Sequence, residues 1–472
     1  MEQLQANHEK AASGMFYGLE FPWNAEALEK MGAPWLTKAF RAAGTLAPDN
    51  FVTKLKDVKE FVGGGACSKL VFEVEYEKAS EDLHTRLFAK IPFPLSGKTL
   101  SDRMSASIVQ QGMDFGEINT YRLLESQLPM KVPKYYFGDI SNETTNFILI
   151  TERVPFGGRE GAHEVEPAYD KMKDWELRGP MDEYYYLLVR LGAKVAGMYK
   201  AEALASFDMI HMFYDPGLRE PHLWGVRPES SGTGDAEFKA KLRMGADFVQ
   251  TTAKVLFPAA CSTAEFLGTW RRTLLTANAY AAEIAWWSNR DPDYVAWCHG
   301  NLNVDNAWWW RDEDGGLLAG VLDWGGAACS SLGNKLWWWL YCCEHDFLSA
   351  ELPGLLRCFA EEYYVHGGPL LDEEELRWQF VLAALNQGAV LLGTVPQIYR
   401  MCPKKQWPTI ESRRDPRIAG NVDGKNTLRI YVGLFVSICR IVGEWDVVER
   451  FDAWVGEVTS AAGIPRKAIP DA

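Results

Sequence analysis

The stretch VAWCHGNLNVDNAWWWRDEDGGLLAGVLDWGG, residues 295–326, contains a polar cluster and two apolar runs. The cluster holds His299 and Asn301, with Asn306 five residues after Asn301, and Asp323 follows the second apolar run. Apolar runs separated by Asp312 to Gly316 are typical of a short hairpin, which would bring Asn306 and Asp323 to neighbouring strand ends. An amide oxygen and a carboxylate held together are hard ligands that Mg²⁺ accepts beside water and phosphate oxygens.

This spacing resembles the catalytic loop and metal-binding segment of the aminoglycoside phosphotransferase, choline kinase and ecdysteroid kinase-like group, distant relatives of protein kinases. In that group the loop runs His-Gly-Asp, four residues and Asn, and the next hairpin ends in Asp followed by Trp or Phe. His299, Asn306 and Asp323 stand in the matching places, whereas Asn301 stands where the group has its catalytic Asp. The resemblance implies an α+β fold that is two-lobed and protein-kinase-like, with a small antiparallel-sheet lobe and a larger, mainly helical lobe. It also implies ATP and Mg²⁺ as cofactors.

A lysine and a glutamate upstream fit the same resemblance. Lys90 lies in the apolar run 87–91, and Glu117 lies in the amphipathic stretch 115–124. A lysine inside an apolar strand must find a counter-charge or reach solvent. In the resembling group the lysine contacts the nucleotide phosphates and is held by a glutamate of the next helix. The alternative is that Lys90 extends to solvent and that Glu117 is a solvated helix residue.

Gly63, Gly64 and Gly65 lie at an expected strand turn. Glycines there let backbone amides come close to a phosphate, although an ordinary hairpin has the same composition. Strands are expected around 70–76, 87–91, 132–138 and 147–154, because their apolar residues alternate or run together between turn residues. The last of these, with Glu152, resembles the strand that enters the interlobe hinge and contacts the adenine ring.

The chain is expected to have three parts: an N-terminal extension over 1–50, a small nucleotide-binding lobe over 51–157 and a large helical lobe over 158–472. The large lobe contains the catalytic loop and an insert around 206–240, rich in Pro, Gly and Ser. Helical periodicity begins near Asp182, a candidate cap. Further helices are expected over 336–343, 352–364, 373–391 and 427–442.

Composition narrows the classes of partner. The 472 residues carry a net charge of −14, which argues against nucleic acid and would suit a cationic small substrate. Nine scattered cysteines favour a reduced, cytoplasmic protein over a disulfide framework. No secretory signal is expected from the first residues, and no run of about 18 apolar residues predicts a membrane span. Together with the resemblance, which implies both, the expected partners are a nucleotide and a small-molecule acceptor.

The predicted activity depends on the amide of Asn301. An amide cannot take a proton near neutral pH, and a general base contributes ~10² to 10⁴ in rate. His299 is expected to brace the loop, and Asp305 is either a replacement base, an added metal contact or a surface carboxylate. The sequence thus predicts a slow ATP- and Mg²⁺-dependent phosphotransferase acting on a hydroxyl of a small molecule. The alternatives are a pseudokinase that binds nucleotide or another ligand without phosphoryl transfer, and nucleotidyl transfer on the same scaffold.

Overall fold

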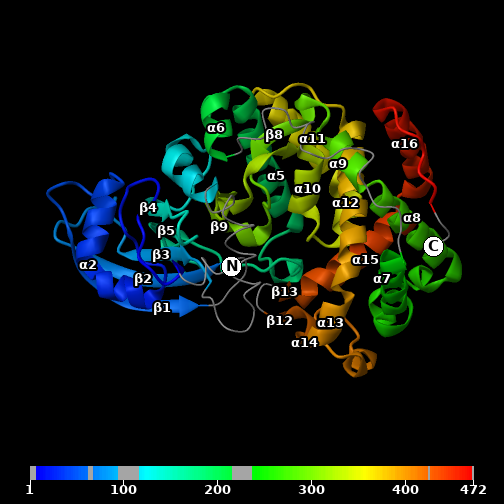
Figure 1. The fold of residues 1–472 in the computed structure, drawn as a ribbon, viewed down its shortest axis with the longest axis horizontal. Helices are drawn as coiled ribbons and strands as arrows, with labels where there is room; N and C mark the ends of the chain where they lie inside the picture. The colour runs from blue at the N-terminus through cyan, green and yellow to red at the C-terminus, as the bar shows by residue number, and fades with distance from the viewer. Residues whose placement is uncertain (1–6, 62–66, 94–115, 215–235, 424–425, 470–472) are drawn as a thin grey trace. The chain divides into compact units, whose positions relative to one another are not determined.

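The computed structural model describes residues 7–61, 67–93, 116–214, 236–423 and 426–469, which form two compact units (Figure 1). Unit 1 comprises Met1–Ala168, Leu204–Asp215 and Asn306–Ala327, and unit 2 comprises Tyr169–Ala203, Pro216–Asp305 and Ala328–Ala472. The expected α+β class is confirmed, because unit 1 is built on an antiparallel sheet and unit 2 is mainly helical. The glycines at 63–65 and much of the insert around 206–240 lie outside the described residues.

A five-stranded antiparallel sheet organises unit 1. Its strands lie in the order β1-β2-β3-β5-β4. Their bounds are β1 Val52–Phe61, β2 Ser68–Tyr76, β3 Arg86–Ile91, β4 Tyr135–Ile140 and β5 Phe147–Glu152. The alternation read from the sequence explains the central strands, since Leu70, Phe72 and Val74 of β2 are buried on one face of the sheet. Lys90 lies in β3, directly opposite Lys69 of β2 and Leu149 of β5.

The N-terminal residues are part of this core. Helix α2 (Ala25–Ala42) packs on β1, and its Leu28, Leu36 and Phe40 are buried with the apolar face of the sheet (Figure 1). Upstream of α2, the buried carboxylate of Asp139 in β4 accepts hydrogen bonds from the backbone N–H groups of Phe16 (2.9 Å) and Tyr17 (3.1 Å). The sequence leaves open whether residues 1–50 pack on the body; of the described part of this segment, Phe21, helix α2 and Leu46 contribute to the core of unit 1.

The rest of unit 1 consists of short elements. Residues 116–119 are α-helical and continue as a π-helical turn, η2 (Thr120–Leu124), and a 3₁₀ turn, η3 (Glu125–Gln127). Two hairpins follow, β6 (Arg159–Glu160) with β7 (His163–Glu164), and β9 (Ala307–Arg311) with β10 (Leu317–Val321). Helix α6 (Phe207–Tyr214) also belongs to this unit, as does the 3₁₀ turn η12 (Trp324–Gly326).

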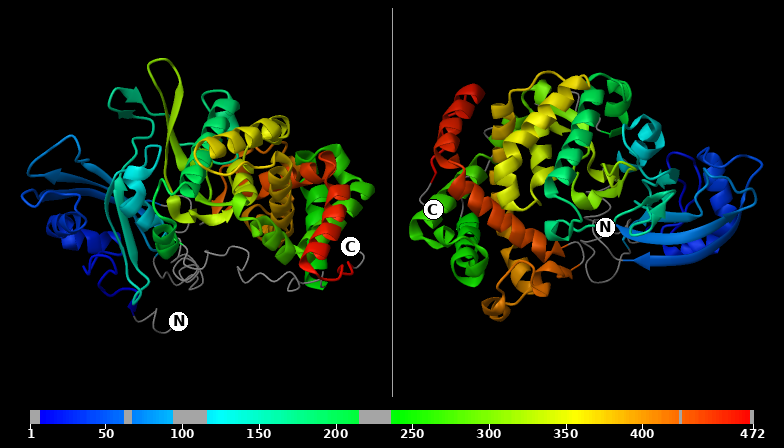
Figure 2. Two further views of the ribbon diagram at one scale, coloured as in Figure 1. Left: turned by 90° about the horizontal axis from the view of Figure 1, so that it is seen from above. Right: turned by 180° about the vertical axis from the view of Figure 1, so that it is seen from behind.

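Unit 2 is a helical assembly with two small two-stranded sheets (Figure 2). Its α-helices are α5 Met181–Lys200, α7 Ala236–Asp247, α8 Ala264–Ala279, α9 Ala281–Asn289, α10 Leu332–Leu340, α11 His345–Val365, α12 Glu373–Leu391, α13 Val395–Met401, α14 Pro416–Ala419, α15 Leu428–Glu444 and α16 Val447–Ala462. The strands are β8 Val295–Cys298 with β11 Ala328–Ser331, and β12 Val422–Asp423 with β13 Asn426–Thr427. Short 3₁₀ and π turns connect them: η4 Asp174–Glu176, η7 Phe248–Thr252, η8 Lys254–Leu256, η9 Ala259–Ser262, η10 Pro292–Tyr294, η11 Val304–Asn306 at the unit boundary, η13 Leu392–Thr394 and η14 Lys404–Thr409.

Helix α12 forms the centre of unit 2. It contacts α8, α10 and α15, and apolar residues are buried on several of its faces, among them Leu376, Phe380 and Leu385. The stretch Glu373–Met401 is long and apolar enough to cross a membrane by length and composition, but 61% of its most apolar window is buried inside the structure. A helix that is hydrophobic all round is expected at the core of a large unit. In the described parts of the chain no other helix passes that test.

Candidate functional site

The hairpin β9–β10 positions the residues predicted to bind metal. Asp312 and Gly316 close the turn through the N–H of Asp312 and the carbonyl of Gly316 (3.0 Å), and Ala307 pairs with Val321 at the other end. One residue beyond, the N–H of Leu322 donates to the carbonyl of Asn306 (3.0 Å). Asn306 and Asp323 therefore come from the adjacent ends of the two strands, as the sequence predicts for a hairpin at this point.

Asp323 has an unusual backbone conformation. Its φ of 65° and ψ of 58° lie in the left-handed region, which costs a residue with a Cβ about 1 kcal/mol or more. In the turn that follows, η12, the backbone N–H of Trp324 donates a hydrogen bond to the carboxylate of Glu117. The strained residue and the turn after it thus aim Asp323 and Trp324 at one place in unit 1.

The three ionisable residues predicted to handle phosphate and metal meet in unit 1. Lys90 Nζ donates to both oxygens of Glu117, at 2.7 and 2.9 Å, and also to the carboxylate of Asp323. The side chains of Lys90 and Glu117 are 12% and 6% exposed, whereas that of Asp323 is 43% exposed. Asp323 is therefore the member of the cluster that solvent, and hence a ligand, can reach.

One ammonium serves two carboxylates in this cluster. Burial works to lower the pKa of Lys90, but Asp323 and Glu117 outweigh it and hold that pKa well above its usual range. Burial raises the pKa of Glu117, and the negative charge of Asp323 adds to this, although Lys90 opposes both. With all three groups ionised they carry a net charge of −1, and Lys69, opposite Lys90 on β2, adds an ammonium that interacts with both carboxylates. The accessible carboxylate of Asp323 is the group that attracts a divalent cation.

Asn306 and Asp323, the predicted magnesium ligands, both carry oxygen atoms of the kind that Mg²⁺ binds. Asn306 is nearly buried and supplies a neutral oxygen, while Asp323 supplies a charged one. Two oxygen donors leave most positions of an octahedral ion to water and phosphate, which is how Mg²⁺ is usually held at nucleotide sites. Among the described residues there is no cluster of three or more His, Cys, Asp and Glu side chains of the kind that would hold a metal ion entirely by protein ligands.

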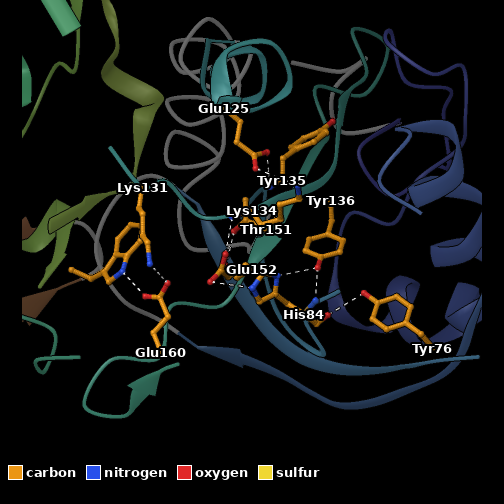
Figure 3. A network of polar contacts seen from close by, with 11 residues as sticks. Tyr76, His84, Glu125, Lys131, Lys134, Tyr135, Tyr136, Thr151, Glu152 and Glu160 are labelled. Atoms are coloured by element: carbon orange, nitrogen blue, oxygen red, sulfur yellow. Dashed lines mark hydrogen bonds and ion pairs between the residues drawn. The ribbon is translucent and has the colours of Figure 1, made fainter. Parts of the chain in front are cut away.

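Glu152 lies at the end of β5, where the sequence predicts a contact with the nucleotide base. Its carboxylate accepts a hydrogen bond from the N–H of Lys134 (3.0 Å) and lies 3.5 Å from His84 Nε2 (Figure 3). Its own N–H donates to the carbonyl of Lys134 (2.8 Å). The Tyr136 hydroxyl accepts from the N–H of His84 (2.6 Å) and extends the same network. These contacts all lie within unit 1, and the predicted base contact stays a prediction.

The residues of the predicted catalytic loop that precede Asn306 belong to unit 2 and are fixed to α10. The carbonyl of His299, which is 1% exposed, accepts from Trp339 Nε1 (2.9 Å). The His299 Nδ1 accepts from the N–H of Asn301 (3.1 Å). Asn303 donates through Nδ2 to the carbonyls of Trp338 (2.7 Å) and Trp339 (3.0 Å). His299 therefore braces the loop in this structure and does not face solvent.

Asn301 and Asp305 share a cationic neighbour that sequence reasoning misses. Lys171 Nζ lies 3.5 Å from Asp305 Oδ2, with the two side chains 16% and 23% exposed. Oriented so that its amide hydrogens meet acceptors, Asn301 also accepts from Lys171 Nζ at 2.7 Å. Lys171 lies 130 residues upstream in a segment without helix or strand periodicity. No spacing in the sequence points to it.

Comparisons with known proteins find only solved structures of low similarity. No protein-family model and no curated protein matches this sequence. A choline/ethanolamine kinase family protein from Mesorhizobium loti is 12% identical over 84% of this chain and 91% of its own, with a TM-score of 0.38. The GDP complex of wild-type aminoglycoside 2'-phosphotransferase-IIIa is 14% identical over 83% and 94%, with a TM-score of 0.37. A microcompartment-associated aminopropanol kinase is 12% identical over 87% and 95%, with a TM-score of 0.35.

Two of these solved structures carry the names of groups that the sequence resembles, an aminoglycoside phosphotransferase and a choline/ethanolamine kinase family protein. Their identities and TM-scores are low, so nothing about the acceptor or the site of this chain follows from them.

Proposed function

We propose that this chain is an ATP- and Mg²⁺-dependent phosphotransferase that acts on a hydroxyl of a small molecule. One observation carries the proposal: Lys90 joins a buried glutamate, Glu117, to an accessible aspartate, Asp323. Burying a lysine and a glutamate is costly, and an apolar pair of the same size would stabilise the unit at least as well. A bound nucleotide and its metal ion would explain why an ion pair lies at this place, next to Asn306 as a second metal-binding residue.

In this proposal unit 1 binds the nucleotide and unit 2 supplies the loop for the acceptor. Lys90 neutralises phosphate oxygens, Glu117 holds its ammonium in position, and Asn306 with Asp323 would hold magnesium. When bound, the magnesium would neutralise charge on the phosphate oxygens. The acceptor oxygen forms a bond to the γ-phosphorus, and the bond from that phosphorus to the bridging oxygen breaks, with its electron pair leaving on ADP.

Asn301 sets the expected rate. The acceptor hydroxyl must still lose its proton, and an amide cannot receive it. In a loose transition state the proton leaves late, and a transferred phosphoryl oxygen or water can accept it. The absence of a carboxylate at this position predicts a rate lower by ~10² to 10⁴ than that of an enzyme with a base there.

A second candidate, a pseudokinase that binds nucleotide without transfer, is favoured by the surroundings of Asn301. Its amide meets two acceptors, the carbonyl of Trp338 at 3.2 Å and Asn303 Oδ1 at 2.6 Å. A carboxylate would face these same oxygens, so the loop is built around an amide. A loop built this way is compatible with binding alone.

The test is turnover of radiolabelled ATP and GTP with Mg²⁺ over a panel of small alcohols, followed by the mass of the product. Phosphotransfer predicts a product heavier by one phosphoryl group, and loss of the signal in Asp323→Asn. Asp314→Asn, at the exposed far end of the same hairpin, is the matched control and should keep the activity. A product carrying AMP would establish nucleotidyl transfer instead. Nucleotide binding without any product would establish the pseudokinase.

A further inference from the structure

Unit 2 contains a small cavity whose lining residues have no role in the proposed phosphotransfer. Its volume is about 270 Å³, and four segments that are distant in the sequence surround it: η4, η8, Glu344 directly before α11, and the loop 411–414. All four segments belong to unit 2. Pockets for drug-sized ligands occupy roughly 300–1,000 Å³. The cavity is therefore of the size that a small molecule fills.

Part of the cavity wall is apolar. Val255 is 64% exposed although its side chain is apolar, and the adjacent Leu256 is half-buried. Trp175 of η4 adds an aromatic side chain to the same lining. A ligand with an apolar body would be stabilised here, because it would remove the surface of these residues from water.

The rest of the wall carries two cations and two anions. Arg413 donates to Glu344, and their side chains are 22% and 33% exposed. Arg414 lies over the ring of Trp175, with its guanidinium carbon 5.0 Å from the ring centroid. Within the described parts of the chain, no carboxylate pairs with Arg414 and no cation pairs with Glu411. The cavity thus has a formal charge of zero, and one guanidinium and one carboxylate are free for a ligand.

Hydrogen bonds hold the charged walls in place. The carboxylate of Asp174, in η4, accepts from the N–H of Glu344 (2.8 Å), which ties η4 to the start of α11. In the loop 411–414, the hydroxyl of Ser412 accepts from the N–H of Arg414 (3.0 Å). A site that is held in its shape before a ligand arrives loses less conformational freedom on binding.

We propose that this cavity binds a small zwitterion with an apolar body, which is the chemistry of an apolar α-amino acid. Arg414 pairs with the carboxylate of the ligand, Glu411 pairs with its ammonium, and the apolar body covers Val255 and Trp175. A ligand with one charge only would cover the second charged side chain without giving it a partner, which is unfavourable. This binding goes beyond the proposed phosphotransferase function and does not depend on it.

The test uses probes that differ only in their charges. L-valine, L-leucine and L-phenylalanine carry both charges, and each is compared with the amine that lacks its carboxyl group and with the carboxylate that lacks its amino group. Binding is followed as thermal stabilisation of the full chain at neutral pH and constant ionic strength. We expect at least one amino acid to stabilise the protein and to bind about tenfold or more tightly than either of its singly charged analogues.

Two variants assign the charges. Arg414→Met should weaken binding of the amino acid and of the carboxylate about tenfold or more, without weakening the amine. Glu411→Gln should weaken the amino acid and the amine, without weakening the carboxylate. The matched controls are Arg272→Met in α8 and Glu361→Gln in α11. Both side chains are exposed, lie outside the cavity and have no ion pair within the described parts of the chain, so neither control should change any affinity.

Three results would overturn the inference. The first is the absence of stabilisation by all three amino acids, and the second is equal stabilisation by the amino acids and their singly charged analogues. The third is a loss of affinity in Arg272→Met as large as that in Arg414→Met. Stabilisation by Mg²⁺ and ATP, measured separately, should be the same in the cavity variants and in wild type. Its absence in wild type would count against the proposed function alone.

Discussion

Removing the ammonium of Lys90 should destabilise unit 1 strongly. In Lys90→Met the carboxylate of Glu117, 6% exposed, loses both of its hydrogen bonds to Lys90 and keeps the one from Trp324 N–H. Leaving one partner of a buried ion pair alone costs about 3–5 kcal/mol. The lower end applies here, because Asp323 is 43% exposed and returns to solvent. We therefore expect a loss of about 3 kcal/mol at pH 8.

The matched control is Lys56→Met in β1 of the same sheet. Lys56 pairs with Glu75, and their side chains are 34% and 51% exposed, so the expected loss is about 0–1 kcal/mol. Urea unfolding measures both: at an m-value of about 3 kcal/mol/M, Lys90→Met moves the midpoint by ~1 M. The double variant Lys90→Met/Glu117→Met should regain most of the loss, since both charges are then gone.

The loss of unfolding free energy in Lys90→Met should also depend on pH. The pKa of Glu117 is already raised in the folded protein by burial, and removing Lys90 raises it further, so protonation at pH 5 relieves part of the destabilisation. A Lys90→Met variant that is no less stable than Lys56→Met, at either pH, would refute the view that this cluster is a buried, mutually dependent set of charges.

Two further variants test unit 2. Burial raises the pKa of Asp174 to about 7, although Tyr185 and the N–H of Glu344 both donate to it. The folded state therefore keeps the proton of Asp174 up to about pH 7, whereas the unfolded state loses it above pH ~3.9. The stability that comes from this difference is fully present below pH ~3.9 and is lost as the pH rises through about 7. Asp174→Asn should flatten the fall in unfolding free energy between pH 5 and pH 8, which is ~2.7 kcal/mol in wild type, from about 1.36 kcal/mol per pH unit over the two units between pH 5 and about 7; an unchanged slope would exclude Asp174 as its source. Asn301→Asp should lower stability at pH 8 by ~1–3 kcal/mol and by less at pH 5, because the new carboxylate faces the oxygens of Trp338 and Asn303; equal stability at both pH values would show that the loop tolerates a charge.

Local patterns in the sequence account for much of the fold. Alternation predicts β2, an apolar run predicts β3, and the turn residues from Asp312 to Gly316 predict the hairpin that brings Asn306 and Asp323 to adjacent strand ends. The bounds of α12 coincide with the expected 373–391, because its run of apolar residues is bordered by Asp372, which caps the helix through Glu374 and Glu375 N–H. In these segments the chemistry that decides the structure lies within a few residues.

The sequence predicts the ends of the helices less accurately than their existence. Helix α10 begins at Leu332, four residues before the expected start, because the hydroxyl of Ser331 caps it by accepting from Asn334 N–H. Helix α11 begins at His345 and continues through Pro353, whose buried neighbours Leu352 and Leu355 hold it in the core. Asp182 lies in the first turn of α5 and is not its cap, since the helix starts directly after Pro180. In each case a local capping or packing contact sets the end, and periodicity does not register it.

Contacts between distant segments could not be predicted. The packing of α2 on β1 depends on the shape of the sheet face, and the pairing of Lys171 with Asn301 joins residues that share no element. Lys90 and Glu117 are predicted as a pair only through the resemblance, because each alone is compatible with a solvated surface residue. The sequence therefore indicates Lys90, Glu117 and Asp323, while only the structure places Lys171 beside Asn301.

The most direct test of the central claim is a calorimetric titration of ATP into the protein with Mg²⁺ and then with a chelator. The accessible carboxylate of Asp323 repels the phosphates of ATP unless a divalent cation lies between them, so ATP should bind about tenfold or more tightly with Mg²⁺, a gain of ~1.4 kcal/mol or more. The same gain should vanish in Asp323→Asn. Equal affinity in the presence of the chelator, or no binding of ATP under either condition, would contradict a magnesium-dependent nucleotide site in unit 1.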